Sequence, residues 1–273
     1  MTKNIFIVGC PRSGTTLLQS ILAAHSDIAS FPETKFFPHL VPGKEPWKSL
    51  GMVSRRFKPY LYNFLVKEIG HPELLANWPP LPFIKFYSHR FAEILTILAA
   101  EQGKSIWLEK TPEHRFYINE IENHFVGVKI IHLLRSGADV VASLYEVTHK
   151  YPHLWHGKWD VDLCVDMWLE AVEISRRHLG KNHHIFVQYE QLVEQPQAVA
   201  EKLSQFLGID FQSQMLANYG DAAKTVSLAA AGRTVSSEIR NANSQKFYQV
   251  FTPEQQEYVL KRLSGVSLDD FVL

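Results

Sequence analysis

The segment Gly9–Thr16, with the sequence GCPRSGTT, is the part of the chain best suited to binding a charged ligand. It follows the apolar run Ile5–Val8, which predicts a buried strand, and precedes Leu17–Leu22, whose apolar positions recur at helical spacing. A glycine-bounded turn between a strand and a helix directs backbone N–H groups and the positive end of a helix dipole at one place, which suits phosphate. The spacing from Gly9 to Gly14 matches that of a nucleotide-binding P-loop.

This loop differs from the loop of ATPases and kinases at one position. Thr15 stands where the P-loop lysine is expected, and Arg12 is the only cation in the segment. The loop therefore predicts a phosphate-bearing nucleotide, but not Mg-ATP used in the ordinary way. The alternative is a glycine-rich turn that only joins a core strand to a core helix, and on this segment alone both interpretations stay open.

A second group of polar residues follows Val128–Leu134, the clearest strand that the sequence predicts. Arg135 ends this strand, and Ser143 lies eight residues later on the predicted helix, on the same face as Ser136. A guanidinium and hydroxyl groups placed in this way could clamp a second phosphate. Alternatively, Arg135 pairs with Asp139 at helical spacing and Ser143 is incidental.

Predicted strands alternate with predicted helices along the whole chain. The strands are expected at Ile5–Val8, Ile28–Phe31, Ile106–Glu109, Val128–Leu134 and His184–Tyr189. The helices are expected at 17–22, 57–69, 88–102, 115–123, 136–145 and 163–172, from Pro196 and from near Thr252, with a loop at Lys224–Arg233. This order predicts an α/β fold, in which a P-loop-type parallel sheet is flanked by helices. Binding sites in such sheets lie at the carboxyl ends of the strands.

The chain is expected to form a single domain over residues 1–273 with helical and loop insertions. Prolines and aromatic residues are concentrated between Phe36 and Pro82, which is typical of lids and loops. We therefore expect an acceptor-side lid at about 36–105. Its aromatic residues either pack a small helical layer onto the core or line an acceptor pocket, and both roles can hold at once.

Composition limits the classes of partner and compartment. Lysine plus arginine equals aspartate plus glutamate, at 28 each, so nothing in the net charge suggests nucleic acid or an anionic membrane. The two cysteines, Cys10 and Cys164, fit a reducing compartment. No apolar run approaches the length of a membrane span, and the first strand begins too early to leave room for a signal peptide. We expect a soluble cytoplasmic protein, whose oligomeric state the sequence leaves open.

Two separated phosphate sites, the missing P-loop lysine and a strand-end lysine at Lys110 together suggest 3′-phosphoadenosine-5′-phosphosulfate as the ligand. In these motifs the chain resembles the sulfotransferase superfamily. PRSGTTLL at Pro11–Leu18 resembles its 5′-phosphosulfate loop, and LLRSGADVVASLY at Leu133–Tyr145 resembles its 3′-phosphate motif. The pattern is most similar to that of tyrosylprotein sulfotransferases and related bacterial enzymes.

Four further segments agree with the resemblance in the correct order: Glu33–Lys35, Lys110 before Thr111 and Pro112, Tyr189–Leu192, and Val226–Leu228 followed by Arg233. The match covers most of the chain but is weak at 36–106 and 149–160. The resemblance implies sulfuryl transfer from 3′-phosphoadenosine-5′-phosphosulfate to a hydroxyl or amine, with 3′,5′-adenosine bisphosphate as the product and without a metal. By analogy with phosphoryl transfer, the protein would position the reactants and stabilise charge.

The resemblance also implies a role for each matching residue. The 5′-phosphosulfate would be held by Arg12 and by the backbone amides of Ser13, Gly14, Thr15 and Thr16, and the 3′-phosphate by Arg135, Ser143 and Arg233. Tyr189 would help seat the nucleotide near its adenine. Lys110 would stabilise the leaving phosphate, and Ser227 would be a second transition-state contact. The alternative for each residue is an ordinary surface ion pair or cap.

The acceptor must lose a proton, so a base is required. Glu33 matches the catalytic glutamate of the tyrosylprotein enzymes and follows a predicted strand. His114 is the alternative, because other sulfotransferases use a histidine shortly after the equivalent lysine, although theirs stands where this chain has Pro112. Each also has a structural alternative: Glu33 could pair with Lys35 or Arg12, and His114 could cap the next helix.

The identity of the acceptor stays open. Lys35 stands where the tyrosylprotein enzymes have an arginine that touches substrate, and the chain lacks their membrane anchor and their cysteine pairing. A phenol, an alcohol or a sugar hydroxyl therefore competes with a peptide tyrosine. A kinase-like phosphotransferase with a displaced lysine and a non-catalytic protein that binds adenosine bisphosphate are the alternative functions. Cys10 is expected to pack rather than react, and His149, His153 and His156 lack a partner at metal-ligand spacing.

Overall fold

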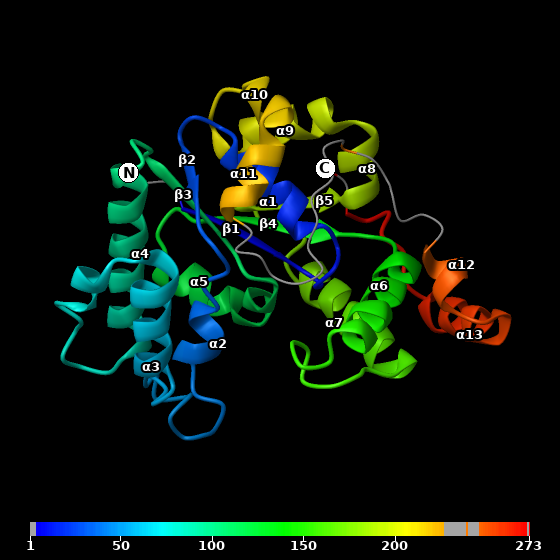
Figure 1. Cartoon of the computed structure of the whole chain (residues 1–273), viewed down its shortest axis with the longest axis horizontal. Coiled ribbons are helices and arrows are strands. Elements are labelled where there is room, and N and C mark those ends of the chain that lie inside the picture. Colours follow the sequence, from blue (N-terminus) through cyan, green and yellow to red (C-terminus); the bar gives the residue numbers. More distant parts are fainter. Residues whose placement is uncertain (1–3, 227–238, 240–245, 272) are drawn as a thin grey trace.

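A sheet of five parallel strands forms the centre of the molecule, with the order β2-β3-β1-β4-β5 (Figure 1). The computed structural model describes residues 4–226, 239, 246–271 and 273. The strands are β1 (Asn4–Gly9), β2 (Ile28–Ser30), β3 (Ile106–Lys110), β4 (Lys129–Leu134) and β5 (His184–Gln188). All five lie where the sequence predicts them, and the α/β prediction is confirmed.

The apolar run of β1 is buried on both faces of the sheet, as expected for a central parallel strand. Ile5 and Ile7 pack on one face, and Phe6 and Val8 pack on the other. Helices α1 (Thr15–Ala23), α8 (Tyr189–Glu194), α9 (Pro196–Leu207), α10 (Gln214–Ala217) and α11 (Tyr219–Val226) cover the face of Ile5 and Ile7.

The opposite face carries two groups of helices. One group covers Phe6 and Val8 and contains α2 (Phe36–Leu40), α3 (Phe57–Tyr62) with its π-helical continuation Asn63–Ile69, the 3₁₀ turn Pro72–Leu75, α4 (Ile84–Glu101) and α5 (Ile118–His124). The other contains α6 (Gly137–Lys150), α7 (Val161–Arg176), α12 (Lys246–Val250) and α13 (Pro253–Leu263), which pack around Leu134 and Phe186. Figure 1 shows the two groups side by side below the sheet.

Three local predictions differ from the structure. A 3₁₀ turn at Pro112–Tyr117 precedes α5, so the helix predicted from Arg115 begins at Ile118 instead. Helix α2 lies in a region predicted to be irregular, because Phe36 stacks on Phe91 of α4. The loop predicted from Lys224 is wrong for its first residues, since 224–226 end α11.

None of the helices in the described part of the chain is both long enough and apolar enough to cross a lipid bilayer. The longest of them, α4, packs Phe91 and Ile94 into the core while Arg90 and Glu93 form an ion pair on its outer side. It is therefore an amphipathic helix of the core layer.

Aromatic rings join β1 and β3 to the helical layer beneath them. Trp107 of β3 meets Phe6 and Phe125 edge to face, with ring centroids 5.5 and 5.9 Å apart, and it is fully buried. Such rings dominate the energy of a core because each buries a large apolar area.

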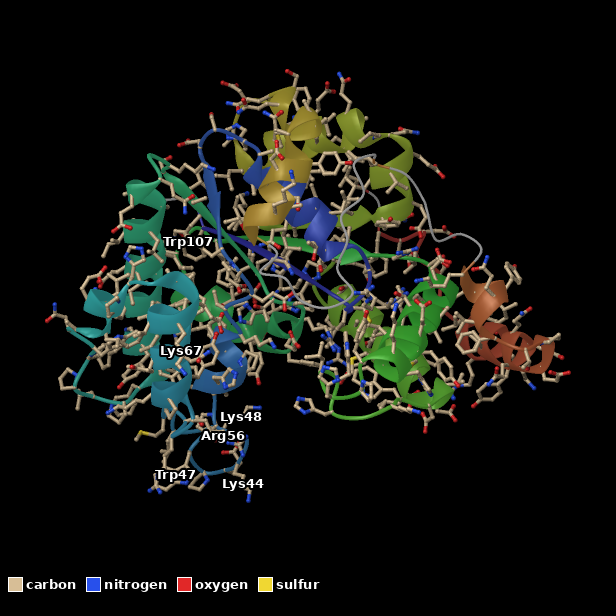
Figure 2. The ribbon with its side chains drawn as sticks, in the orientation of Figure 1. Lys44, Trp47, Lys48, Arg56, Lys67 and Trp107 are labelled. Atoms are coloured by element: carbon tan, nitrogen blue, oxygen red, sulfur yellow. The ribbon has the colours of Figure 1, made fainter. Side chains whose placement is uncertain are left out.

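We predict that Trp107→Ala lowers the free energy of unfolding by about 3–5 kcal/mol, because it opens a cavity that its neighbours cannot fill. Trp47→Ala is the matched control, since Trp47 is 54% exposed and lies at the outer tip of the helical layer, far from Trp107 (Figure 2). It should change stability by about 0.5 kcal/mol or less. Urea unfolding of both variants tests this, and equal losses would contradict the assignment of the core.

Candidate functional site

The chemically suited side chains gather beyond the carboxyl ends of the strands. Strands β1, β3 and β4 end at Gly9, Lys110 and Leu134, and the parallel pairing puts these ends on one edge of the sheet. The motifs after these strands, which are far apart in sequence, are therefore neighbours in space. This is the edge at which ligands bind in open parallel sheets.

The loop between β1 and α1 has the geometry of an anion cradle. Arg12 and Gly14 adopt left-handed conformations, with φ of 72° and 98°. A Cβ atom at Gly14 would lie 2.5 Å from Cδ2 of Tyr189, so only glycine fits between the loop and that ring. The first-turn N–H groups of α1, including those of Thr15 and Thr16, belong to the four that a helix leaves without an intrahelical partner. They can receive an anion at the positive end of the helix.

Arg12 connects the two anion motifs that the sequence separates. Its Nε donates to Oγ of Ser143 at 3.2 Å. Ser143 is buried on α6, the helix that follows β4, whereas Arg12 follows β1. The structure therefore brings these two predicted ligand-binding residues together in one site.

Arg135 is buried between three other side chains. Its Nη2 donates to Oδ2 of Asp139 at 3.0 Å, and its guanidinium lies 4.2 Å from the ring centre of Tyr189. Nε1 of Trp168 donates to its backbone carbonyl at 2.9 Å. The pairing with Asp139 that the sequence left as an alternative is thus present. Among the described residues, Nε of Arg135 has no hydrogen-bond partner although it is buried.

Tyr189 is enclosed between Gly14 and Arg135, as the contacts above require. Burial raises the pKa of its phenol, although the nearby guanidinium of Arg135 acts in the opposite direction. The side chain is therefore a neutral aromatic wall of the site at physiological pH.

Lys110 and Glu33 form an ion pair at the N-terminal end of α1. The Lys110 side chain is 2% exposed and that of Glu33 is 13% exposed. Nζ of Lys110 also lies 3.5 Å from Oγ1 of Thr16. The two residues from which the sequence predicts acid–base and leaving-group chemistry therefore meet directly beside the anion cradle.

Glu109 was not among the site residues predicted from the sequence. It binds Thr34 and Thr111, the chain neighbours of Glu33 and Lys110. Its Oε1 accepts from the N–H and the hydroxyl of Thr34 at 3.2 and 2.8 Å, and from the hydroxyl of Thr111 at 2.6 Å. Its Oε2 lies 2.7 Å from Nδ1 of His114. Burial raises the pKa of Glu109, but the attraction of His114 and the hydrogen bonds outweigh it and hold the pKa below its usual value.

His114 lies inside this network. Its Nε2 accepts the backbone N–H of Phe37 at 3.4 Å, and its Nδ1 lies beside Glu109. The ring is fully buried and packs against Phe6 and Phe37. This environment favours a positioning role over that of a base, and the assignment of His114 as a base stays a prediction.

The other residues that the sequence singled out fall into three groups. Ser227 and Arg233 lie outside the described residues. Ser13 is buried, and its hydroxyl has no hydrogen-bond partner within the described part of the chain. Burial raises the pKa of the Cys10 thiol to about 12, so this loop cysteine is a packing residue and not a thiolate nucleophile.

The fold and the motifs match proteins of known class. A model described as the sulfotransferase family matches residues 4–213. Protein-tyrosine sulfotransferase A of Caenorhabditis elegans is 23% identical over 256 residues, which is 88% of this chain and 58% of that protein. The chain thus spans less than two thirds of this relative's length.

Two solved structures share the fold. The sulfotransferase domain from the Synechococcus PCC 7002 olefin synthase has a TM-score of 0.62 and 24% identity, covering 97% of this chain and 95% of that one. Mouse sulfotransferase SULT7A1 complexed with PAP has a TM-score of 0.55 and 16% identity, covering 97% of this chain and 86% of that one. At 24% and 16% identity, these two similarities show the fold of the chain and nothing more.

We predict that Glu109→Gln lowers stability in a pH-dependent way. Because folding depresses the pKa of Glu109, its contribution is present above the unfolded value of 4.5 and is lost as pH falls through the folded value. The difference in unfolding free energy between wild type and Glu109→Gln should therefore be largest near neutral pH and shrink on acidification. Chemical unfolding across pH 3–7 measures it. Glu173→Gln, at an exposed pair with Arg177, is the control, and a pH-independent difference for Glu109→Gln would refute the prediction.

Proposed function

Because the chain belongs to the sulfotransferase family, it is a transferase, and we propose that it moves a sulfuryl group from 3′-phosphoadenosine-5′-phosphosulfate to a hydroxyl or amine of an acceptor. The observation that carries this proposal is the Lys110–Glu33 ion pair beside the N-terminus of α1. In this proposal the ammonium serves the leaving phosphate and the carboxylate serves the acceptor proton, and the pair lies beside the anion cradle. PAP, with which the mouse sulfotransferase was solved, is the product that this donor leaves.

The residues of the site fit a ligand with two anionic ends. Ser13 Oγ in the loop after β1 and Arg135 Nε after β4 are buried donors with no hydrogen-bond partner among the described residues. Leaving such groups unpaired is costly, and an anionic ligand would satisfy both. In this proposal Arg12 and the α1 amides hold the 5′-phosphosulfate.

A second cradle, which consists of Arg135 and Ser143, would receive the 3′-phosphate. Arg135 and Ser143 hold it there in this proposal, and Tyr189 forms the wall next to the nucleotide. The contact between Arg12 and Ser143 supports one continuous site, because it joins the loop after β1 to the helix after β4. Arg233 stays a predicted third ligand of this phosphate.

The donor supplies an electrophilic sulfur and a phosphate leaving group. Glu33 takes the proton from the acceptor hydroxyl as its oxygen bonds to sulfur, and Lys110 donates a hydrogen bond to the oxygen that departs with the phosphate. The ammonium of Lys110 has three N–H donors, so it can share itself between Glu33 and the phosphate. Ser227 stays a predicted second contact to the transferring group.

The helical layer of 36–105 is the proposed acceptor side, because the chain runs from Glu33 through Lys35 directly into α2. A small phenol, an alcohol, a sugar hydroxyl and a peptide tyrosine all remain candidate acceptors. Lys44, Lys48 and Arg56 extend from the outer tip of this layer (Figure 2). The absence of a nucleic-acid partner and the cytoplasmic location also stay predictions.

We predict that Glu33→Gln lowers turnover by about 10²–10⁴-fold, because the acceptor loses its base. Binding of 3′,5′-adenosine bisphosphate should change little. Lys110→Ala should lower turnover by about 10²–10³-fold, as for other groups that stabilise developing charge. Transfer of labelled sulfate to a panel of acceptors measures turnover, and calorimetry measures nucleotide affinity.

Glu93→Gln is the matched control for these variants, since Glu93 pairs with Arg90 at the surface of α4. It should keep full activity. The assignment of the base is wrong if Glu33→Gln stays active while His114→Gln, folded to the same extent, does not.

We predict that adenosine 3′,5′-bisphosphate raises the melting temperature of the protein more than ATP does at equal concentration. The ligand that binds the folded protein more tightly stabilises it more. Arg12→Ala should weaken binding by about 10–100-fold, the loss expected for one charged hydrogen bond. Arg56→Ala, at an exposed arginine, is the control. A larger shift with ATP, together with transfer of labelled phosphate, would replace the proposal with the kinase-like alternative.

A further inference from the structure

A cluster of basic side chains surrounds one carboxylate far from the candidate site. Glu122 belongs to α5, His184 is the first residue of β5, and His183 directly precedes it. Since the candidate site follows the carboxyl ends of the strands, this cluster lies at the opposite edge of the sheet. No step of the proposed transfer uses it.

More nitrogen atoms meet Oε1 of Glu122 than one oxygen can satisfy. Nζ of Lys181 lies 2.7 Å from it, and Nε2 of His183 and of His184 each lie 2.8 Å from it. A carboxylate oxygen offers about two lone-pair positions, so three donors exceed its capacity. Two imidazole lone pairs and this carboxylate would instead be satisfied together by a cation between them.

His178 provides a second, independent observation at this cluster. Its Nδ1 lies 3.9 Å from the same oxygen of Glu122 and has no hydrogen-bond partner among the described residues. The residue is only 8% exposed, so water does not readily supply a hydrogen bond to this nitrogen. Its ring stacks on that of His184, with a centroid distance of 4.8 Å and an angle of 5°. Both rings therefore present an edge to the same carboxylate.

A hydrogen-bonded relay holds His184 from behind. Its Nδ1 lies 2.8 Å from Nε2 of His132, and Nδ1 of His132 lies 3.0 Å from the hydroxyl of Ser175. A metal-binding histidine usually donates its other ring N–H to a hydrogen-bond acceptor, which fixes its tautomer and orientation, and here the acceptor would be Nε2 of His132. With the proton on Nδ1, the lone pair of His184 Nε2 points toward Glu122.

We propose that Glu122, His183 and His184 bind a divalent transition-metal ion of the zinc type. Their ligand atoms all lie within 4.8 Å of one another. Ligands of a tetrahedral zinc ion are about 3.4 Å apart, so a small outward movement of the side chains makes room for the ion. Two imidazoles and one carboxylate suit zinc better than magnesium or calcium, which prefer oxygen ligands. Water or His178 completes the coordination.

Lys181 is the competitor of the metal at this site. Its ammonium contacts both oxygens of Glu122, at 2.7 and 2.9 Å, and would repel a divalent ion. The Lys181 side chain is 36% exposed, so it can move into solvent when the metal binds. Removing this ammonium should therefore tighten metal binding, an outcome that an ordinary ion-pair network would not produce. The bound ion would tie α5 to the start of β5 as a structural staple.

The test uses the untagged full chain after treatment with a chelator. Calorimetric titration with Zn²⁺ should give one ion per chain and a raised melting temperature, and Mg²⁺ should give neither. Co²⁺ should give the intense visible absorption of a tetrahedral complex with nitrogen and oxygen ligands. His183→Gln should weaken Zn²⁺ binding at least about tenfold. Its side chain is 41% exposed, so the fold should tolerate the change.

Two further variants decide between a metal site and an ion-pair network. Lys181→Met should tighten Zn²⁺ binding, and the control His153→Gln, at an exposed loop histidine, should leave it unchanged. The proposal is overturned if the wild type binds no Zn²⁺, if His183→Gln and His153→Gln bind it equally, or if Lys181→Met fails to tighten binding. Activity is not needed as a readout, so this test is independent of the proposed transfer reaction.

Discussion

The candidate site depends on one buried charge, the carboxylate of Glu109. A carboxylate taken out of water must receive hydrogen bonds or an opposite charge, because an unpaired one would cost several kcal/mol. Here Thr34 and Thr111 donate hydrogen bonds to one oxygen, and Nδ1 of His114 lies 2.7 Å from the other. Thr34 is the neighbour of Glu33, and Thr111 is the neighbour of Lys110. Satisfying Glu109 therefore also fixes where the two proposed reactive side chains lie, and the stability of the core and the geometry of the site share one network.

The parallel sheet does the rest of the positioning. Because all strands run in one direction, the loops after β1, β3 and β4 meet at a single edge, and each then restrains the others. Arg12 contacts Ser143, and the ring of Tyr189 lies between Gly14 and Arg135. A side chain at Gly14 would disturb Tyr189 and through it the guanidinium of Arg135. The loop after β1 and the segment after β4 are therefore structurally coupled.

The sequence predicts those parts of the molecule that are determined locally. Apolar runs identify all five strands, and the spacing of glycines identifies the loop after β1. The network around Glu109 was missed because its members come from two segments that only the fold brings together, although an acid in the apolar run of β3 was a usable signal. The cluster at Glu122 was missed for the same reason, since α5 and β5 are far apart in sequence. Helix α2 was missed because its packing on α4, not its own pattern, makes it helical.

The pairing of Lys110 with Glu33 has a consequence for the order of events in the proposed reaction. While the ammonium holds the carboxylate, that carboxylate is a weaker acceptor for a further proton, because the nearby positive charge favours its ionised form. A donor phosphate at the α1 cradle competes for the same ammonium, since Lys110 already lies beside Thr16. Sharing the ammonium with a phosphate, whose negative charge lies nearby, would then weaken its hold on Glu33 and strengthen Glu33 as a base. In the proposed reaction the base would therefore reach its full strength only with the donor in place, so the donor would bind before the acceptor is activated.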